Sequence, residues 1–259
     1  MQLLRILRNK SAKRFKMQLE ILFYVLLVLV AFLYSSVGHG GASGYLALMA
    51  FFSFTPETMR PTALLLNIFV SLIAFVQYYR AGFFRWNLFW PYALASFPAA
   101  FIGGMITVDV GLYKKILAVL LLFSVVKLLG IKFKTTTFDM KHNVFIALLI
   151  GAIIGLFSGM IGIGGGIILS PILLLLHWAD MKKTAAVSAL FIFVNSIAGF
   201  AGLFTKGFEF KTEMGWMIVL ALIGGIAGAH FGANRFKREF LNKILAIVLI
   251  IASIKLIIT

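Results

Sequence analysis

The sequence has no cysteine and few charged residues. Only 12% of its 259 residues are Asp, Glu, Lys or Arg, whereas soluble domains average about 25%. The absence of cysteine excludes a disulfide framework, a thiolate metal site and a cysteine nucleophile. The shortage of charge, beside 62% hydrophobic residues, excludes a soluble globular domain, because one core of this size could not bury so much apolar side chain.

Acidic residues are especially scarce, and each lies in a loop or at the end of an apolar run. The eight are Glu20, Glu57, Asp109, Asp139, Asp180, Glu209, Glu213 and Glu239. Proton relays and cation pumps usually keep a carboxylate at mid-membrane, so this distribution disfavours both classes. No two acids have the spacing of a hydrolase pair, and no His/Glu cluster has metal-ligand spacing. We therefore expect no catalytic residues, no metal and no cofactor.

Basic residues are frequent and give the chain a net charge of +16. Six of the 24 lie in the first 16 positions: Arg5, Arg8, Lys10, Lys13, Arg14 and Lys16. In a membrane protein such an excess marks cytoplasmic loops and contact with anionic lipid, so we expect no nucleic-acid partner. Residues 1–17 are predicted to form a basic interfacial segment on membrane lipids. The apolar run after it lacks a small-x-small cleavage site and is predicted to be a retained span.

Eight apolar runs are long enough to cross a bilayer, which takes about 20 residues. They cover roughly 18–38, 61–80, 87–107, 113–130, 142–162, 184–204, 214–234 and 241–258. Two shorter runs, at 44–54 and 167–178, each follow a glycine cluster. The sequence thus predicts an all-α polytopic membrane protein with about eight full transmembrane helices plus two short broken or re-entrant helices. With eight crossings and a cytoplasmic N-terminus, 14 Lys and Arg lie inside and 9 outside (Lys127 omitted), against 12 and 11 for ten crossings, so the positive-inside rule favours eight.

The chain is internally duplicated. Gly38-His39-Gly40-Gly41 aligns with Gly162-Ile163-Gly164-Gly165 at an offset of 124, Gly82-Phe83 with Gly207-Phe208 and Ser71 with Ser196 at 125, and Lys115-Ile116-Leu117-Ala118 with Lys243-Ile244-Leu245-Ala246 at 128. This series predicts a first membrane repeat at 18–130, a polar linker at 131–141 and a second repeat at 142–259. An odd number of crossings per repeat would make the repeats inverted and an even number parallel; the sequence leaves both open.

The glycine clusters are the first candidates for a binding site. The residues concerned are Gly38, His39, Gly40, Gly41 and Ser43 in the first cluster, and Gly162, Gly164, Gly165 and Gly166 in the second. Glycine permits a sharp turn, and the helix that follows presents free N–H groups and the positive end of its dipole. Two such helix starts near the midplane would bind an anion without a buried Lys or Arg, as in transporters with broken helices. The alternative is close helix packing or a flexible link, and for His39 a packing or capping role beside contact with substrate or proton transfer.

Polar side chains follow each short helix and extend the candidate site. They are Asn67 and Ser71 in the first half, and Ser188, Asn195 and Ser196 in the second. Asn67 and Ser71 are four residues apart and share one helix face, so they could donate hydrogen bonds to an oxyanion. Interhelical hydrogen bonding is the alternative. Arg60, Lys182 and Lys183 lie nearby in sequence and would either draw anions to a pathway or be solvated interfacial charges.

Three other small-residue series at spacings of four are predicted to be helix-contact faces. They are Gly151, Gly155 and Gly159; Gly224, Gly228 and Gly232; and Ala95, Ala99 and Gly103. These residues are expected to build the scaffold around the site.

A glycine-rich turn that closes the first span of each half and opens a short apolar helix resembles the TauE/SafE sulfite exporter family of bacterial membrane proteins. The second half carries the fuller motif, Gly162-Ile163-Gly164-Gly165-Gly166 with Pro171, whereas the first half has His39 and Ala47 at positions where the family pattern has a small or apolar residue and proline. The resemblance covers about residues 18–258. It implies transport of sulfite, sulfonates or related sulfur-containing anions across the bacterial cytoplasmic membrane.

The sequence therefore predicts a multi-pass membrane transporter, and an exporter by the resemblance, with a small anionic substrate bound between two glycine-rich helix starts. Its oligomeric state is open, and the N-terminus is expected in the cytoplasm. Two other classes remain: an anion channel or non-transporting membrane scaffold, and an intramembrane lipid-modifying enzyme, for which no catalytic constellation is visible.

Overall fold

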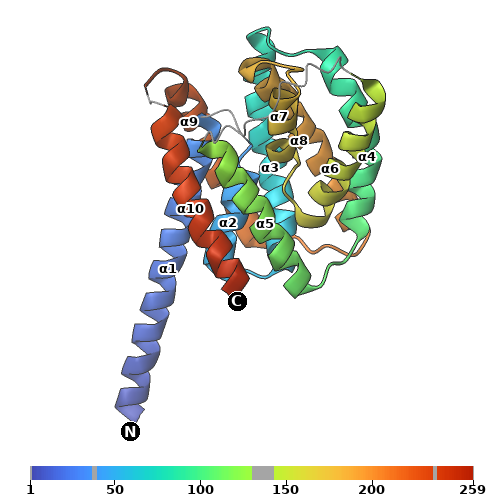
Figure 1. Cartoon of the computed structure of the whole chain (residues 1–259). Coiled ribbons are helices and arrows are strands. Elements are labelled where there is room, and N and C mark those ends of the chain that lie inside the picture. Colours follow the sequence, from blue (N-terminus) through green and yellow to red (C-terminus); the bar gives the residue numbers. More distant parts are fainter. Residues whose placement is uncertain (1, 37–39, 130–142, 236–237, 259) are drawn as a thin grey trace.

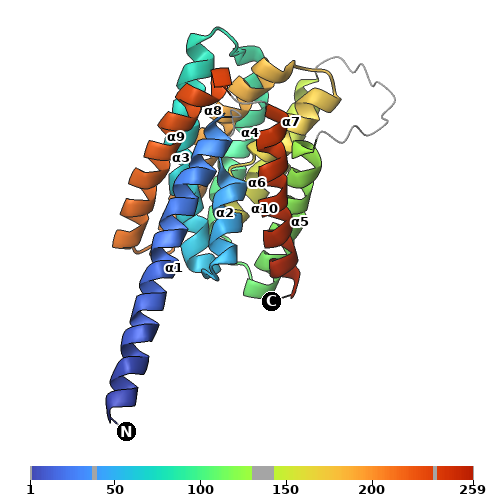
Figure 2. The ribbon, with the colours of Figure 1, turned by 90° about the vertical axis from the view of Figure 1, so that its left-hand side faces the viewer.

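The computed structural model describes residues 2–36, 40–129, 143–235 and 238–258, and this part of the chain is all-helical, as predicted. The helices are α1 (Gln2–Ser36), α2 (Ala42–Phe51), α3 (Pro56–Arg80), α4 (Trp86–Met105), α5 (Val110–Leu128), α6 (Val144–Ile161), α7 (Gly166–Leu175), α8 (Met181–Phe204), α9 (Thr212–Arg235) and α10 (Arg238–Ile258) (Figure 1). The N-terminal part of α1, which holds the predicted interfacial segment, extends beyond the bundle (Figures 1 and 2). The predicted linker at 131–141 lies outside the described residues.

Five segments of the described helices are long and apolar enough to cross a membrane. They are Met17–Ser35, Pro56–Arg80, Trp86–Met105, Val144–Ile161 and Lys182–Phe204. Shorter apolar helices run over Ala42–Phe51, Thr212–Gly228 and Leu245–Ile258. Large apolar side chains cover the outside of the bundle, for example Phe145 at 83% and Val119 at 65% exposed, which is the surface that lipid requires and water penalises. The chain is a multi-pass membrane protein, and the predicted total of eight full crossings stays a prediction.

Each short helix runs back along the long helix before it. Tyr34 near the end of α1 shares a hydrogen bond of 2.6 Å with Ser43 at the start of α2, whereas Phe23, earlier in α1, stacks 5.0 Å from Phe54 just beyond α2. The helices α1 and α3 therefore begin on the same side of the bundle. This connectivity is that of ten crossings, for which 12 Lys and Arg residues lie on one side of the membrane and 11 on the other. The overall charge count therefore assigns no orientation.

Turns of the same kind recur in both halves of the chain. Left-handed backbone occurs at Gly41 and Gly165, at Ser53 and His177, and at Gly82 and Gly207. The first two pairs are separated by 124 residues and the third by 125. Gly41 and Gly165 precede the two 10-residue helices α2 and α7, whose ends Ser53 and His177 follow. The offsets are those of the sequence duplication.

Helix contacts follow the same correspondence. The helix α4 packs against α6 and α8, and α9 packs against α1 and α3; α3 also packs against α8, and α5 against α10 (Figures 1 and 2). The partners α3 and α8 are antiparallel, because Lys182 at the start of α8 lies over Phe83 beyond the end of α3, while Leu203 at the end of α8 lines a cavity with Glu57 of α3.

Two of the predicted small-residue series lie at the closest helix contacts. Cβ atoms added to Gly151, Gly155 and Gly159 of α6 would collide with the carbonyl oxygens of Tyr92, Ser96 and Ala100 of α4, and those added to Gly224 and Gly228 of α9 with Val28 and Phe32 of α1. Gly103 of α4 likewise meets the carbonyl of Leu156. The prediction of contact faces is confirmed for these glycines. Backbone contact of this kind gives membrane helices van der Waals attraction where lipid supplies no hydrophobic drive.

Candidate functional site

The two glycine turns end one helix and start the next, as the sequence predicts. Gly41 precedes α2 with φ 84°, and Gly165 precedes α7 with φ 76°. Neither helix start has a side-chain cap, so first-turn N–H groups remain available to a ligand. A residue with a Cβ is strained at such a positive φ, which explains glycine at both places. Gly38 and His39 lie outside the described residues.

The α3–α8 contact brings the two turns together with the predicted polar side chains. A Cβ placed on Gly164 would lie 2.8 Å from Asn67 Nδ2 and 3.3 Å from Ser196 Oγ. A Cβ placed on Gly40 would lie 3.5 Å from Ser71 Cβ. Each glycine is thus next to the serine of its own half, and the lack of a side chain is what leaves these groups adjacent.

Four polar side chains of α3 and α8 are fully buried and have no hydrogen-bond partner among the described residues. Asn67, Ser71, Asn195 and Ser196 are each 0% exposed, and their amide and hydroxyl atoms have no partner. An unsatisfied buried polar group costs about 1–3 kcal/mol, so such groups call for an explanation. We call these four residues the polar cluster. Its donors are neutral, and three of its members, Asn67, Ser71 and Ser196, adjoin the glycine turns at which the sequence predicts a site.

Two other predicted site residues have partners within the protein. Ser188 shares a hydrogen bond of 2.9 Å with Ser170, whose hydroxyl donates to the carbonyl of Gly166. The Ser43 hydroxyl is hydrogen-bonded to the Tyr34 hydroxyl. Both hydroxyls hydrogen-bond within the protein, which is the packing role that the sequence offered as the alternative to substrate binding. They stabilise the starts of α7 and α2 respectively.

Ile192 adjoins both glycine turns, although no motif in the sequence marks it. Its side chain is within 3.3 Å of Cβ atoms placed on Gly40 and Gly164, and it also meets one placed on Gly166. It therefore lies between the two glycine turns. The duplication offset could have found it, since Ile192 is 125 residues after Asn67.

Arg60 has neither of the roles that the sequence suggested. It is 7% exposed, and its guanidinium donates to four carbonyls at the ends of α4 and α6: Gly159 (2.9 Å), Ile106 (2.9 Å), Gly103 (2.7 Å) and Gly104 (2.6 Å). A cation at two helix C-termini is opposite the negative ends of their dipoles. Arg60 is therefore a structural clamp, because its guanidinium N–H groups donate to backbone carbonyls inside the fold.

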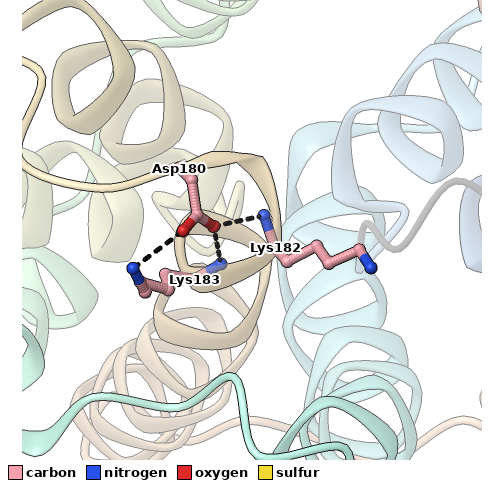
Figure 3. Close-up of polar contacts among 3 residues, drawn as sticks. All are labelled: Asp180, Lys182 and Lys183. Atoms are coloured by element: carbon pink, nitrogen blue, oxygen red, sulfur yellow. Dashed lines mark hydrogen bonds and ion pairs between the residues drawn. The ribbon is translucent and has the colours of Figure 1, made fainter.

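The lysines at the start of α8 belong to its N-terminal cap (Figure 3). Asp180 accepts hydrogen bonds from the backbone N–H groups of Lys182 (3.0 Å) and Lys183 (2.9 Å), and forms a 2.8 Å ion pair with Lys183 Nζ. The hydrogen bonds from Lys183 hold the pKa of the Asp180 carboxyl below its usual value. Lys182 Nζ lies 4.7 Å from the Phe83 ring centroid.

A cavity of about 400 Å³ opens on the side where α3 begins. Its charged lining includes Arg60, Glu57, Lys206, Glu209 and Lys211. Arg60 also adjoins the second glycine turn, because a Cβ on Gly162 would lie 2.9 Å from the Arg60 carbonyl oxygen.

Comparison with known proteins decides the family. The family model described as "Sulfite exporter TauE/SafE" matches residues 23–256. The chain belongs to the TauE/SafE family. It is similar to "Probable membrane transporter protein y4hK" of Sinorhizobium fredii, at 32% identity over 242 residues that cover 92% of this chain and 96% of that protein. This confirms the resemblance that the glycine motifs indicated.

Two further similarities cover only part of the chain. "Probable membrane transporter protein YunE" of Bacillus subtilis is 30% identical over 47% of this chain and 43% of its own, and "Probable membrane transporter protein MJ0441" of Methanocaldococcus jannaschii is 25% identical over 64% and 63%. No solved structure matches the chain. The three relatives are named as membrane transporters, and the TauE/SafE membership places this chain in a transporter family.

Proposed function

We propose that this chain exports a small sulfur-containing oxyanion, such as sulfite or a sulfonate, across the bacterial cytoplasmic membrane. The substrate binds at the polar cluster, between the glycine turns that precede α2 and α7. The single observation that carries this site is the set of partnerless amide and hydroxyl atoms of Asn67, Ser71, Asn195 and Ser196.

The chemistry of the cluster suits an anion of modest charge. Two amide NH₂ groups and two hydroxyls donate hydrogen bonds, and two uncapped helix starts add N–H groups and positive dipole ends. Donors that are neutral avoid the large cost of burying an isolated cation when the substrate leaves. Arg60, the buried cation described above, already donates to four backbone carbonyls. Sulfur enters the proposal from the family's description alone.

We propose further that the chain consists of two inverted repeats of five helices, each with four long helices and one short helix that also returns across the bundle, which gives an odd number of passages per repeat. Support comes from the recurring left-handed turns, from the matching contacts α4 with α6 and α9 with α1, and from the antiparallel course of α3 and α8. Inverted repeats around a midplane site allow alternating access, as one repeat moves against the other. The N-terminus is placed in the cytoplasm because six basic residues lie in its first 16 positions.

The test is thermal stability of the purified full chain in detergent against sulfite, sulfate, thiosulfate, taurine, sulfoacetate, phosphate and chloride. A ligand that binds only the folded state raises the melting temperature with its occupancy. We expect saturable stabilisation by at least one sulfur oxyanion, and loss of that stabilisation in Ser71→Ala.

The matched control is Ser253→Ala. Ser253 is also a buried helical serine, but its hydroxyl donates to the carbonyl of Leu249 in α10 (2.7 Å), remote in sequence from the polar cluster. Ser253→Ala should retain the anion effect. Stabilisation by none of the seven anions, or equal loss in both variants, would overturn the proposed site.

A further inference from the structure

The site between the glycine turns is symmetric in position but not in chemistry. Gly40 is next to Ser71 and Ile192, and Gly164 is next to Ser196 and Asn67. Ser71 and Ser196 are equivalent at the offset of 125, and so are Asn67 and Ile192. Each glycine therefore contacts the serine of its own half and, from the other half, the residue at the Asn67/Ile192 position. At these contacts the difference is an amide on α3 where α8 has a branched alkyl group; Asn195 of α8, whose equivalent on α3 is Val70, adds a second amide to the polar cluster.

The position of Ile192 makes this difference matter. Its Cδ1 and Cγ2 atoms lie 3.2 and 3.3 Å from a Cβ placed on Gly40, and Cγ2 lies 2.8 Å from one placed on Gly164. The residue is 5% exposed. It thus presents methyl groups to both glycine turns, while the Asn67 amide is a nearest neighbour of Gly164. A bare oxyanion would meet Asn67 and Ser196 beside Gly164, whereas beside Gly40 it would meet the methyl groups of Ile192 together with Ser71.

We infer that Ile192 sets the specificity of the site, and that the preferred ligand is an oxyanion carrying a short apolar group. This rests on the proposed function. The charged end lies at Asn67, Ser71, Asn195 and Ser196, and the apolar group lies against Ile192. Burying an oxyanion oxygen against methyl groups forfeits its hydration without a replacement hydrogen bond, whereas burying a methylene there is favourable.

The test measures apparent dissociation constants of methanesulfonate, propanesulfonate and sulfite by thermal-shift titration of the detergent-purified full chain. The two sulfonates carry the same charge, so their ratio isolates the apolar contact. In the unaltered chain propanesulfonate should bind at least about tenfold more tightly than methanesulfonate, since one methylene in a fitted pocket is worth roughly tenfold or more.

The decisive variants are Ile192→Val and Ile192→Thr, which have nearly the same shape and differ by a methyl and a hydroxyl. Ile192→Val should keep the propanesulfonate preference, and Ile192→Thr should reduce it to within about threefold while sulfite binds more tightly. Ile192→Ala is a third test, because the larger apolar space should make a sulfonate with a longer alkyl chain the tightest ligand.

The outcomes separate the two proposals. Sulfite and methanesulfonate binding as tightly as propanesulfonate, or equal ratios in Ile192→Val and Ile192→Thr with no change of chain-length optimum in Ile192→Ala, would overturn the specificity role and leave the anion site standing. Binding of none of the three probes, and of none of the seven anions named above, to the unaltered chain would overturn the proposed function itself.

Discussion

The Nε of Arg60 donates a 2.9 Å hydrogen bond to the carbonyl oxygen of Gly159, joining the first turns of α3 to the last turn of α6. The same guanidinium holds the last turn of α4. Three helices are thereby fastened at one buried cation, at the side of the bundle where α3 begins. This arrangement gives the first prediction.

Replacing Arg60 with methionine should destabilise the fold by more than about 2 kcal/mol, because several helix-end carbonyls lose charged donors and remain buried. The measurement is the unfolding transition in detergent. Arg80→Met is the control, since Arg80 lies exposed at the end of α3 and surface changes stay within about 0.5 kcal/mol. Equal effects of the two substitutions would contradict the clamp.

Replacing Gly155 with alanine should cost about 1–3 kcal/mol, because a Cβ there collides with the Ser96 carbonyl oxygen and pushes α4 from α6. Gly215→Ala is the matched change in α9, where the nearest atom outside the helix, on Phe210, is 3.8 Å from the added Cβ. It should be neutral or slightly stabilising, as alanine favours helices. Thermal unfolding of both variants checks the pair, and a stable Gly155→Ala would refute the close contact.

Replacing Gly164 with alanine should abolish anion binding, because the added Cβ would lie 2.8 Å from both Asn67 Nδ2 and Ile192 Cγ2. Gly82→Ala controls for backbone strain. Both glycines have nearly the same φ, 74° and 76°, but nothing lies within 4 Å of a Cβ on Gly82. Anion-dependent stabilisation should persist in Gly82→Ala. Its loss in both variants would assign the effect to strain rather than to the site.

Replacing Asp180 with asparagine should flatten the acid dependence of stability. The folded-state pKa of Asp180 lies below its usual value, so the cap stabilises the fold at pH above about 4, the unfolded value, and this contribution is lost as pH falls through the folded value. Asparagine still caps a helix, so only the titrating charge is removed. Melting temperatures measured downward from pH 5 should fall less in the variant; parallel curves would contradict the prediction.

The sequence predicts the helical class, the short helices and the glycine turns, because each depends on local pattern: apolar run length, glycine at positive φ, and recurrence at a fixed offset. It also predicts the close helix contacts at Gly155 and Gly228, since small residues four apart in a membrane helix form a face that packs against another helix. The direction in which α2 runs cannot be predicted from the sequence, because it depends on contacts between separate segments, such as that of Phe23 with Phe54.

The polar cluster was predicted only as a set of separate residues. That Asn67 and Ser196 both reach Gly164 follows from the crossing of α3 and α8, which no local pattern encodes. Arg60 was misread for a related reason. A basic residue near a predicted span end is usually solvated, and its acceptors lie more than 40 residues away in sequence. Ile192 looked like any apolar helix residue until its neighbours were known.

The contact of α1 with α9 has a consequence for how the chain is made. The glycine face of α9 meets the backbone of α1, yet α1 leaves the ribosome before α9 does. Until α9 has been synthesised, α1 must therefore lie in the bilayer with the surface that will contact α9 exposed to lipid. A chain truncated after α8 would insert but leave this surface uncovered, making it a substrate for membrane proteases, and supplying the α9–α10 segment as a separate polypeptide should protect it.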